Sequence, residues 1–428
     1  MGAGPLRRTY VRGPLGATRA LRLAVAALLP LAVALSGRSA WAADAEWNTE
    51  LAFDERYDDN ITRLSRRDLD RLGSTTGGTG LPCGSGNTDS SGHRFSITTP
   101  DDFISIPQVS STLKAGWLAE MPTTFGVDLT AYQYARNSVK NYQSYRLSIA
   151  QTLHPVKAYA TSVRGSYSFQ PRFYQRNLRS DRTAEDFAQM GIFILPPPRR
   201  EATYRGESAE LQIDQVILPD RLRFQGTFGK ETRDYNRCFD ERDSHMPYRE
   251  AELAWNPRGN SRLRLRASYG REALRAKGDL ADTAVFFEPD ISNVRDVLGG
   301  DVRFGWKRHG RGGWVALRYE SERRDFKAKD PNDLCHFGRN DRLEQTGLSA
   351  QMDLSGGWLL AAEARHQSNK STFPAPGGVI STCEEITNYD DNIFQVGFAY
   401  RFKSSRAGKR ERNPRPEEPS GQGEGGSP

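Results

Sequence analysis

The feature of this sequence that most restricts its fold is a two-residue alternation of apolar and polar side chains, repeated in many short segments. The segment from Asn392 to Phe402 reads N-I-F-Q-V-G-F-A-Y-R-F and places five apolar residues, four of them aromatic, on one face. Successive side chains of a β-strand point to opposite faces, so a period of two predicts a strand with one apolar face. The same alternation recurs at 46–57, 125–131, 145–153, 159–169, 209–213, 222–228, 251–255, 263–269, 302–306, 315–319, 348–354 and 358–364.

Segment length and connection length separate a membrane barrel from a soluble double sandwich, the alternative fold. With its flanking residues, each predicted strand runs for about 10 to 13 residues, the length that a tilted strand needs to cross a bilayer. Short connections such as 120–122, 218–220 and 355–357 alternate with long polar ones such as 58–102, 170–202 and 371–391. A sandwich does not require this asymmetry. We therefore predict an all-β fold: a transmembrane, antiparallel, up-and-down β-barrel with short periplasmic turns and long extracellular loops. It has about 14 strands, or up to about 18 if the longest loops hide further hairpins.

Composition agrees with a barrel that has a polar interior. Only 37% of residues are apolar and the mean hydropathy is −0.68, yet 10% are aromatic. A disordered chain lacks such aromatic content, whereas a barrel needs apolar side chains on its outer face alone. The net charge of +7 comes largely from arginines and lysines near the two ends of the chain. No basic helix or stacking motif accompanies that charge, so we do not expect nucleic acid as a partner.

The two ends of the chain have compositions of their own. Arginines precede an apolar core from Leu23 to Leu35, and Ala40-Trp41-Ala42 is a small-x-small cleavage site. Residues 1–42 are therefore predicted to be a signal peptide for Sec export, cleaved after Ala42. Residues 43–402 form the predicted outer-membrane barrel. Residues 403–428, rich in Arg, Glu, Pro, Gly and Ser, are predicted to be a disordered periplasmic tail.

The chain contains four cysteines, which are widely separated and show no C-x-x-C spacing of the kind that binds zinc. Each lies in a stretch that we predict to be an extracellular loop, and an even count in an exported protein predicts two disulfides. Three pairings are possible, and we prefer the one that joins loops adjacent in the closed barrel. The preferred pairs are Cys83 with Cys383, and Cys238 with Cys335.

Two stretches resemble known outer-membrane proteins. Gln395, Gly397, Tyr400 and Phe402 match the order of residues in the C-terminal recognition strand of bacterial outer-membrane barrels, a resemblance that implies the barrel-assembly machinery as a partner. The Tyr57-Asp58-Asp59-Asn60-Ile61 stretch resembles the opening of a family of outer-membrane β-barrel porins associated with exopolysaccharide export in Gram-negative bacteria. A related stretch, 388–393, opens the closing strand. The resemblance implies an outer-membrane location, with membrane lipid, a polysaccharide and periplasmic export components as partners. Asp and Asn here also suit a simple turn.

The alternation also indicates which polar residues face the lumen. Leu263 and Leu265 face outward, so the neighbouring arginines face inward as a possible track for acidic or hydroxyl-rich sugars; ion pairs that brace the wall are the alternative. The lumen candidates are Arg262, Arg264, Arg266, Arg221, Arg223, Tyr132 and Tyr134.

Catalytic motifs, metal-ligand spacings and nucleotide-binding loops do not emerge from the sequence. We therefore expect no enzymatic activity, cofactor or metal. The leading hypothesis is a conduit or accessory in the export of a surface polysaccharide. The alternatives are a diffusion porin for small solutes and a plugged structural or adhesive barrel.

Overall fold

The computed structural model describes residues 46–63, 97, 99–118, 121–153, 159–179, 199–257, 262–277, 290–308, 311–329, 336–372 and 388–403. Three short 3-10 helices, η2 (Ser138–Lys140), η4 (Arg237–Arg242) and η6 (Ser355–Gly357), lie between strands. None of the helices among the described residues has the length or hydropathy of a membrane span. The strands are β1 (Glu46–Asp58), β2 (Asp102–Leu118), β3 (Met121–Tyr134), β4 (Tyr142–Leu153), β5 (Thr161–Arg179), β6 (Arg199–Leu218), β7 (Leu222–Tyr235), β8 (Ser244–Trp255), β9 (Leu263–Ala276), β10 (Asn293–Arg308), β11 (Arg311–Phe326), β12 (Asn340–Asp353), β13 (Trp358–Thr372) and β14 (Tyr389–Lys403).

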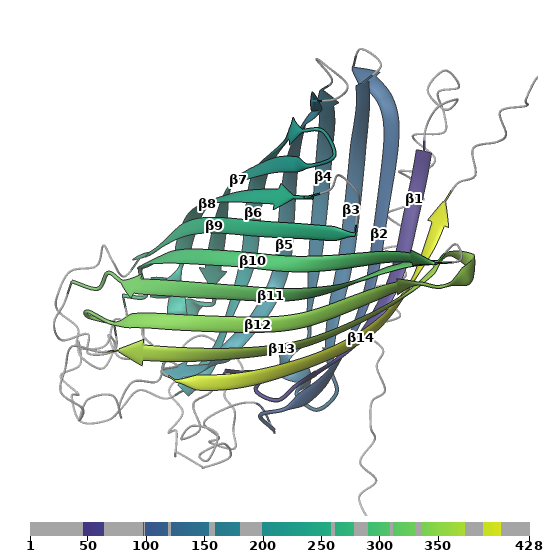
Figure 1. Ribbon diagram of the computed structural model, residues 1–428. Coiled ribbons are helices and arrows are strands. Elements are labelled where there is room, and N and C mark those ends of the chain that lie inside the picture. Colours follow the sequence, from purple (N-terminus) through teal and green to yellow (C-terminus); the bar gives the residue numbers. More distant parts are fainter. Residues whose placement is uncertain are drawn as a thin grey trace, which may run out of the picture.

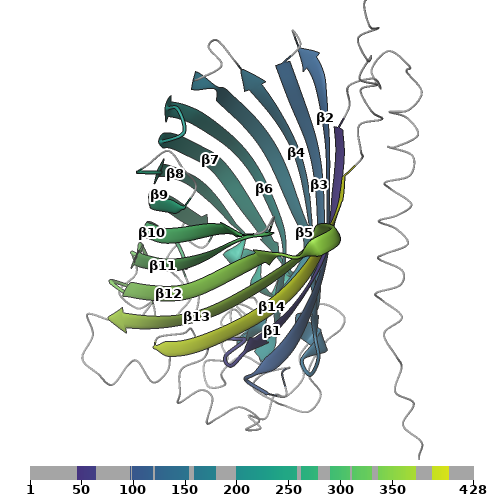
Figure 2. The same cartoon turned by 45° about the vertical axis from the view of Figure 1, so that its right-hand side comes forward.

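The strands form one closed barrel in which every strand pairs with its neighbours in sequence, and β1 pairs with β14 to close the ring. Figures 1 and 2 show β1 (purple) beside β14 (yellow), with the other strands following in order around the wall. All pairs are antiparallel. The predicted all-β, up-and-down barrel of about 14 strands is confirmed.

Several strands are longer than the sequence pattern predicted. β5 has 19 residues and β6 has 20. Their pairing continues to Arg179 opposite Arg199, so part of the predicted 170–202 loop is strand. Beyond the bilayer both faces of a strand meet water, and the apolar alternation fades there while the backbone hydrogen bonds continue. The extended parts of β5 and β6 lie at the end of the barrel that carries the β1–β2, β5–β6, β9–β10 and β13–β14 connections. We call this the long-connection end. The opposite end, with the β6–β7, β10–β11 and β12–β13 connections, is the short-turn end.

The outer face of the barrel is apolar. Leu147, Leu298 and Leu317 are between 55% and 60% exposed, and each is flanked along its strand by residues that face the lumen. A continuous exposed surface of this kind marks contact with lipid. Near the short-turn end the face becomes aromatic: the rings of Trp358 and Tyr400 lie 4.9 Å apart, and those of Tyr400 and Phe402 lie 4.5 Å apart. The chain is therefore a membrane-spanning barrel with an aromatic girdle.

At the seam between β1 and β14, a glycine makes room for a carboxylate. Gly397 lies opposite Asp54, and a Cβ atom at position 397 would overlap Oδ1 of that side chain. Asp54 also accepts a hydrogen bond from Nε2 of Gln108, 2.9 Å from its Oδ2. The absence of a side chain at Gly397 thus lets Asp54 lie across the closing strand and contact β2 through Gln108.

The two Y-D-D-N-I stretches of the sequence meet at the long-connection end of this seam. The carboxylate of Asp59 accepts hydrogen bonds from the backbone N and from Nδ2 of Asn392, both at 2.7 Å. Nδ2 of Asn60 donates to the backbone O of Asp390 at 3.1 Å, and the backbone N of Asp59 donates to the O of Asn392 at 3.2 Å. We call these contacts the seam clasp; they fasten the first strand to the last just beyond their paired residues.

Substitution of Gly397 by alanine should force Asp54 out of its place and lower the free energy of unfolding by about 1–3 kcal/mol. Gly347→Ala is the matched control, because a Cβ there meets only the O of Ala364 at an ordinary 3.7 Å. Urea unfolding in lipid vesicles measures both. The Asp54→Ala/Gly397→Ala double variant should recover much of the loss; equal effects of the two glycine substitutions would contradict this account.

The seam clasp should respond to side chains selectively. Asp59→Ala leaves two donors of Asn392 without their acceptor and should cost about 1–3 kcal/mol, since hydrogen bonds to a charged group are among the stronger ones. Asp390→Ala should change little, because this residue takes part through its backbone O. The temperature at which the folded barrel loses its compact band on gels reports both. An Asp390→Ala variant as damaged as Asp59→Ala would exclude the clasp.

Candidate functional site

The inward face of β8 to β11 carries a cluster of ion pairs, and we call it the charged wall. Arg266 of β9 contacts Asp301 of β10, the residue directly opposite it, and its Nη1 lies 3.6 Å from Oε2 of Glu252 on β8. Nη2 of Arg264 lies 4.0 Å from the other oxygen of Glu252. One carboxylate thus lies between two guanidinium groups, an arrangement that braces neighbouring strands and keeps charge at the lumen surface.

A second group of ion pairs lies on the same wall, nearer the long-connection end. Arg295 of β10 contacts Glu272 of β9 and places Nη1 3.1 Å from Oε2 of Glu322 on β11. Nη2 of Arg324 lies 2.7 Å from the other oxygen of Glu322. The charged wall therefore follows the strands over much of their length.

Several polar atoms of the lumen wall remain without a hydrogen-bond partner among the described residues. They include Oδ2 of Asp301 and the Nε atoms of Arg295, Arg303 and Arg365. The guanidinium of Arg303 lies 4.1 Å from the ring centre of Trp314, a cation–π contact that orients it. Buried polar atoms are normally paired, so these atoms are exceptions within the wall and do not face the open lumen.

Aromatic rings on five consecutive strands, β3 to β7, form an unbroken row, which we call the aromatic row. The rings of Tyr132 and Tyr142 stack with centres 4.2 Å apart, and Phe173 follows at 5.1 Å from Tyr142. Tyr204 lies 5.2 Å from Phe173, and Tyr235 lies 5.1 Å from Tyr204. These separations are those of favourable aromatic pairs. The aromatic row thus lies on β3 to β7, which also carry inward ion pairs such as Arg146 with Glu210.

The chain that leaves β1 turns into the barrel rather than away from it. Ile61 packs with Ile104 and Ile106 of β2, and Tyr132 and Tyr134 lie against this cluster. The backbone N of Ile61 donates to the O of Pro100 at 2.9 Å. Ile104 and Ile106 are each only 1% exposed although they occupy the inward face. This end of the lumen therefore contains an apolar cluster.

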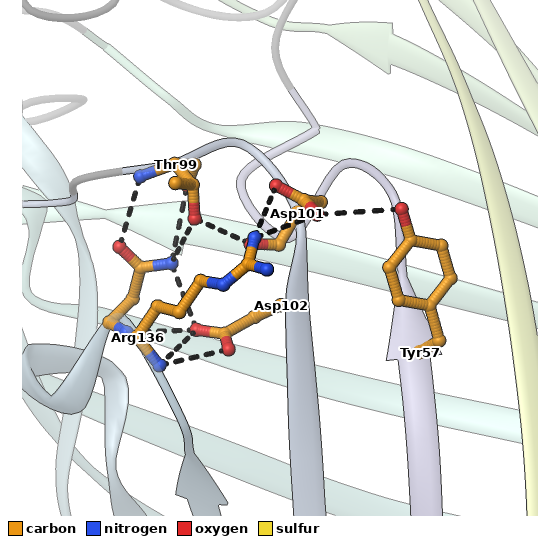
Figure 3. A network of polar contacts seen from close by, with 6 residues as sticks. Tyr57, Thr99, Asp101, Asp102 and Arg136 are labelled. Carbon is orange, nitrogen blue, oxygen red and sulfur yellow. Dashed lines mark hydrogen bonds and ion pairs between the residues drawn. The ribbon is translucent and has the colours of Figure 1, made fainter.

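A polar network holds the β3–β4 connection against the start of β2 (Figure 3). The carboxylate of Asp102 accepts hydrogen bonds from the backbone N of Arg136 at 3.0 Å and of Asn137 at 2.8 Å. Arg136 also pairs with Asp101 at 3.1 Å, and the hydroxyl of Tyr57 donates to the same carboxylate at 3.5 Å. Asp102 is fully buried. The network fixes the strand ends that carry Tyr132 and Tyr134.

The sequence-predicted lumen residues do not form one group. Arg264 and Arg266 lie together on β9, whereas Arg262 is exposed in the turn before that strand. Arg223 lies on the inward face of β7, whereas Arg221 lies in the β6–β7 turn, where its backbone N donates to the O of Leu218. Tyr132 and Tyr134 lie on β3, in the part of the wall that carries the aromatic row.

The remaining predicted residues divide between the seam and undescribed parts of the chain. Oε1 of Gln395 accepts a hydrogen bond from Nε of Arg56 at 2.9 Å, and Gly397, Tyr400 and Phe402 lie on β14 as given above. Cys83, Cys335 and Cys383 lie outside the described residues, and the side chain of Cys238 is not described either. The disulfides therefore stay a prediction, as do the signal peptide and the tail.

Sequence reasoning missed several residues of the lumen wall. The alternation could have identified Trp314 as a lumen residue. Val315 and Leu317 are predicted to face outward, so the residue before Val315 must face inward. Arg295 lies between the 263–269 and 302–306 segments, where the alternation predicts no strand. Phe173 carried no usable signal: the β5–β6 register shifts between Gln170 and Phe173 and again after Tyr174, so the simple alternation fails there.

No family model and no curated protein matches this chain. Solved structures do resemble it. One described as a bacterial polysaccharide outer membrane secretin has 10% identity and a TM-score of 0.39, covering 83% of this chain and 98% of that one. A TodX monoaromatic hydrocarbon channel has 9% identity and a TM-score of 0.41, covering 84% and 90%. OprD from Pseudomonas aeruginosa has 9% identity and a TM-score of 0.32, covering 85% and 94%. At these values the comparisons assign no substrate, and the chain is defined by its own geometry as a closed barrel of the outer-membrane type.

Proposed function

We propose that the protein is an outer-membrane channel for small hydrophilic solutes, with the charged wall as the surface along which charged solutes pass. The observation that carries the proposal is the chemistry of that wall, where Arg264 and Arg266 share Glu252 and Arg266 also contacts Asp301. Both signs of charge are present, so cations and anions each meet a local partner. Weakly held pairs at separations of 3.6 to 4.0 Å can exchange a partner for a solute.

The apolar cluster at the long-connection end supports a selective passage over a wide one. Ile61 comes from the connection after β1 and packs on inward-facing residues of β2. A segment that folds back into the lumen occupies part of its cross-section. We infer that solutes are selected first by size at this end and then by charge along the charged wall.

Charge substitutions on the wall should change ion selectivity in opposite directions. Arg264→Gln/Arg266→Gln leaves Glu252 and Asp301 uncompensated and should shift the reversal potential in a salt gradient toward cation selectivity, whereas Glu252→Gln should shift it toward anions. A unit charge about 4 Å from an ion in water contributes about 1 kcal/mol, so permeability ratios should change roughly fivefold.

The outward-facing Arg249→Gln is the matched control and should leave the reversal potential unchanged. Planar bilayer recordings on variants that retain the compact folded band make the comparison. The channel proposal would be excluded if the wild-type protein showed no conductance, or if neither lumen variant changed the reversal potential.

A second candidate function is a conduit or accessory in the export of a surface polysaccharide, and the aromatic row favours it. Tyrosine rings offer apolar faces and hydroxyls to sugars. The guanidinium of Arg233 lies 5.4 Å from the ring centre of Tyr204, and its Nε lies 2.6 Å from Oε1 of Glu231. A row that crosses five strands suits a polymer better than a small solute.

Loss of the gene should deplete surface polysaccharide and raise the periplasmic pool if export is the function. Complementation with Tyr142→Ala/Phe173→Ala should then restore export only partly, because two successive rings of the aromatic row are missing. Tyr145→Ala, on the outward face of β4, is the matched control and should complement fully. Assays of surface and periplasmic polysaccharide distinguish the two functions. An unchanged surface pool in the deletion strain would reject the export role in favour of the small-solute channel.

A further inference from the structure

Basic residues occupy one register line on the outer face of six neighbouring strands. Arg249 of β8 lies directly opposite Arg271 of β9, which lies opposite Asp296 of β10. Asp296 lies opposite Arg323 of β11, and that residue lies opposite Arg342 of β12, which in turn lies opposite Lys370 of β13. We call the five cations the outer basic row. Its members follow the wall at the interstrand spacing of about 4.8 Å, with a single anion among them.

The outer basic row is exposed, and three of its arginines have acidic partners on the same face. The side chains of Arg271, Arg323 and Arg342 are 49%, 68% and 64% exposed. Nη2 of Arg323 lies 3.3 Å from Oδ1 of Asp325, and Nη2 of Arg342 lies 2.8 Å from Oε1 of Glu344. Nε of Arg271 is 3.8 Å from Asp296, whose carboxylate also accepts a hydrogen bond from the hydroxyl of Tyr269. Arg249 and Lys370 have no ion-pair partner within the described part of the chain. The five cations face three carboxylates, those of Asp296, Asp325 and Glu344, so a net positive charge remains on this face.

The arrangement carries an energetic cost that the three ion pairs offset only in part, because Arg249 and Lys370 lie directly opposite Arg271 and Arg342. Like charges placed directly opposite one another on a sheet face destabilise the pair. The outer basic row contains three such pairs: Arg249 with Arg271, Arg323 with Arg342, and Arg342 with Lys370. An anion lying between the guanidinium groups removes the repulsion and adds charge-assisted hydrogen bonds.

The height of the row indicates where that anion comes from. On β9 and β10 the line follows directly after Tyr269 and Leu298, which face outward and are 47% and 60% exposed. Leu253 and Tyr319 face outward four residues from Arg249 and Arg323, respectively. The row thus begins where the lipid-facing apolar surface ends, at the level of the headgroups.

We propose that the outer basic row binds the phosphate groups of an anionic membrane lipid whose acyl chains cover the apolar face of β8 to β12. Planar guanidinium groups match phosphate oxygens in pairs, and juxtamembrane cations attract anionic headgroups. A lipid contacts the row and the apolar face together, whereas free phosphate contacts the row alone. The lipid keeps this side of the barrel oriented at the membrane surface, independently of what passes through the lumen.

Lipid retention tests the proposal. The full chain is reconstituted in phosphatidylcholine vesicles with or without bisphosphorylated lipid A, extracted into mild detergent, and analysed for bound lipid by native mass spectrometry. We expect wild-type protein to retain lipid A in preference to phosphatidylcholine. The variant Arg249→Gln/Arg271→Gln/Arg323→Gln/Arg342→Gln should lose at least fivefold of that retention. Arg205→Gln/Lys230→Gln, which removes two outward cations from β6 and β7, is the matched control and should keep it.

Two further arms make the outcome decisive. Inorganic phosphate at the same phosphate concentration should not displace lipid A; full displacement would reassign the row as a general anion site and overturn the lipid proposal. If the fourfold variant does not fold, Arg323→Gln/Arg342→Gln replaces it, and Arg323→Lys/Arg342→Lys should retain lipid at an intermediate level because charge is kept while paired hydrogen bonds are lost. Equal retention in wild type and both glutamine variants would overturn the proposal.

Discussion

The hydrogen-bonded ladder between β1 and β14 is the constraint on which the rest of this molecule depends. No water is present in a bilayer to satisfy backbone N–H and C=O groups, so a sheet survives there only if its first and last strands pair. The chain secures this pair in two places: Gly397 admits Asp54 at mid-strand, and the seam clasp joins Asp59 to Asn392 at the long-connection end. Closure also places β1 beside β14 and so brings two similar sequence stretches into contact, although they are separated by most of the chain.

Once the wall is closed, the two sides of the lumen take different roles. Arginine and acidic side chains on β8 to β11 meet across strands, whereas β3 to β7 present rings that touch one another in sequence. Ion pairs keep charge at a surface that water can reach, and the aromatic row provides a continuous run of rings beside the Arg146–Glu210 and Arg233–Glu231 ion pairs. A passage with these two walls suits solutes that carry both polar groups and apolar faces, which is why a small-solute channel and a saccharide conduit are the two functions considered.

Arginine has opposite surroundings on the two faces of the same strands. Arg266 faces inward and contacts Asp301 and Glu252, so its charge is matched within the protein. Arg271, five residues along β9, faces outward with Asp296 at 3.8 Å and another arginine directly opposite. The first pattern stabilises a wall, and the second leaves charge for a partner outside it. The same residue type therefore has a different significance according to the face on which the strand places it.

The sequence by itself determined the fold and the division of each strand into an outward and an inward face, because a period of two is a local property that any reader of the chain can follow. It placed Arg264, Arg266, Tyr132 and Tyr134 on strands, but it joined Arg262 to the same track and missed Arg295 and Phe173. Tertiary structure alone decided the register between strands, which sets the partners of Arg266, the continuity of the aromatic row and the line of the outer basic row. Register depends on backbone pairing between distant segments, on bulges such as those in β5, and on closure at Gly397. None of these is encoded in the pattern of a single segment.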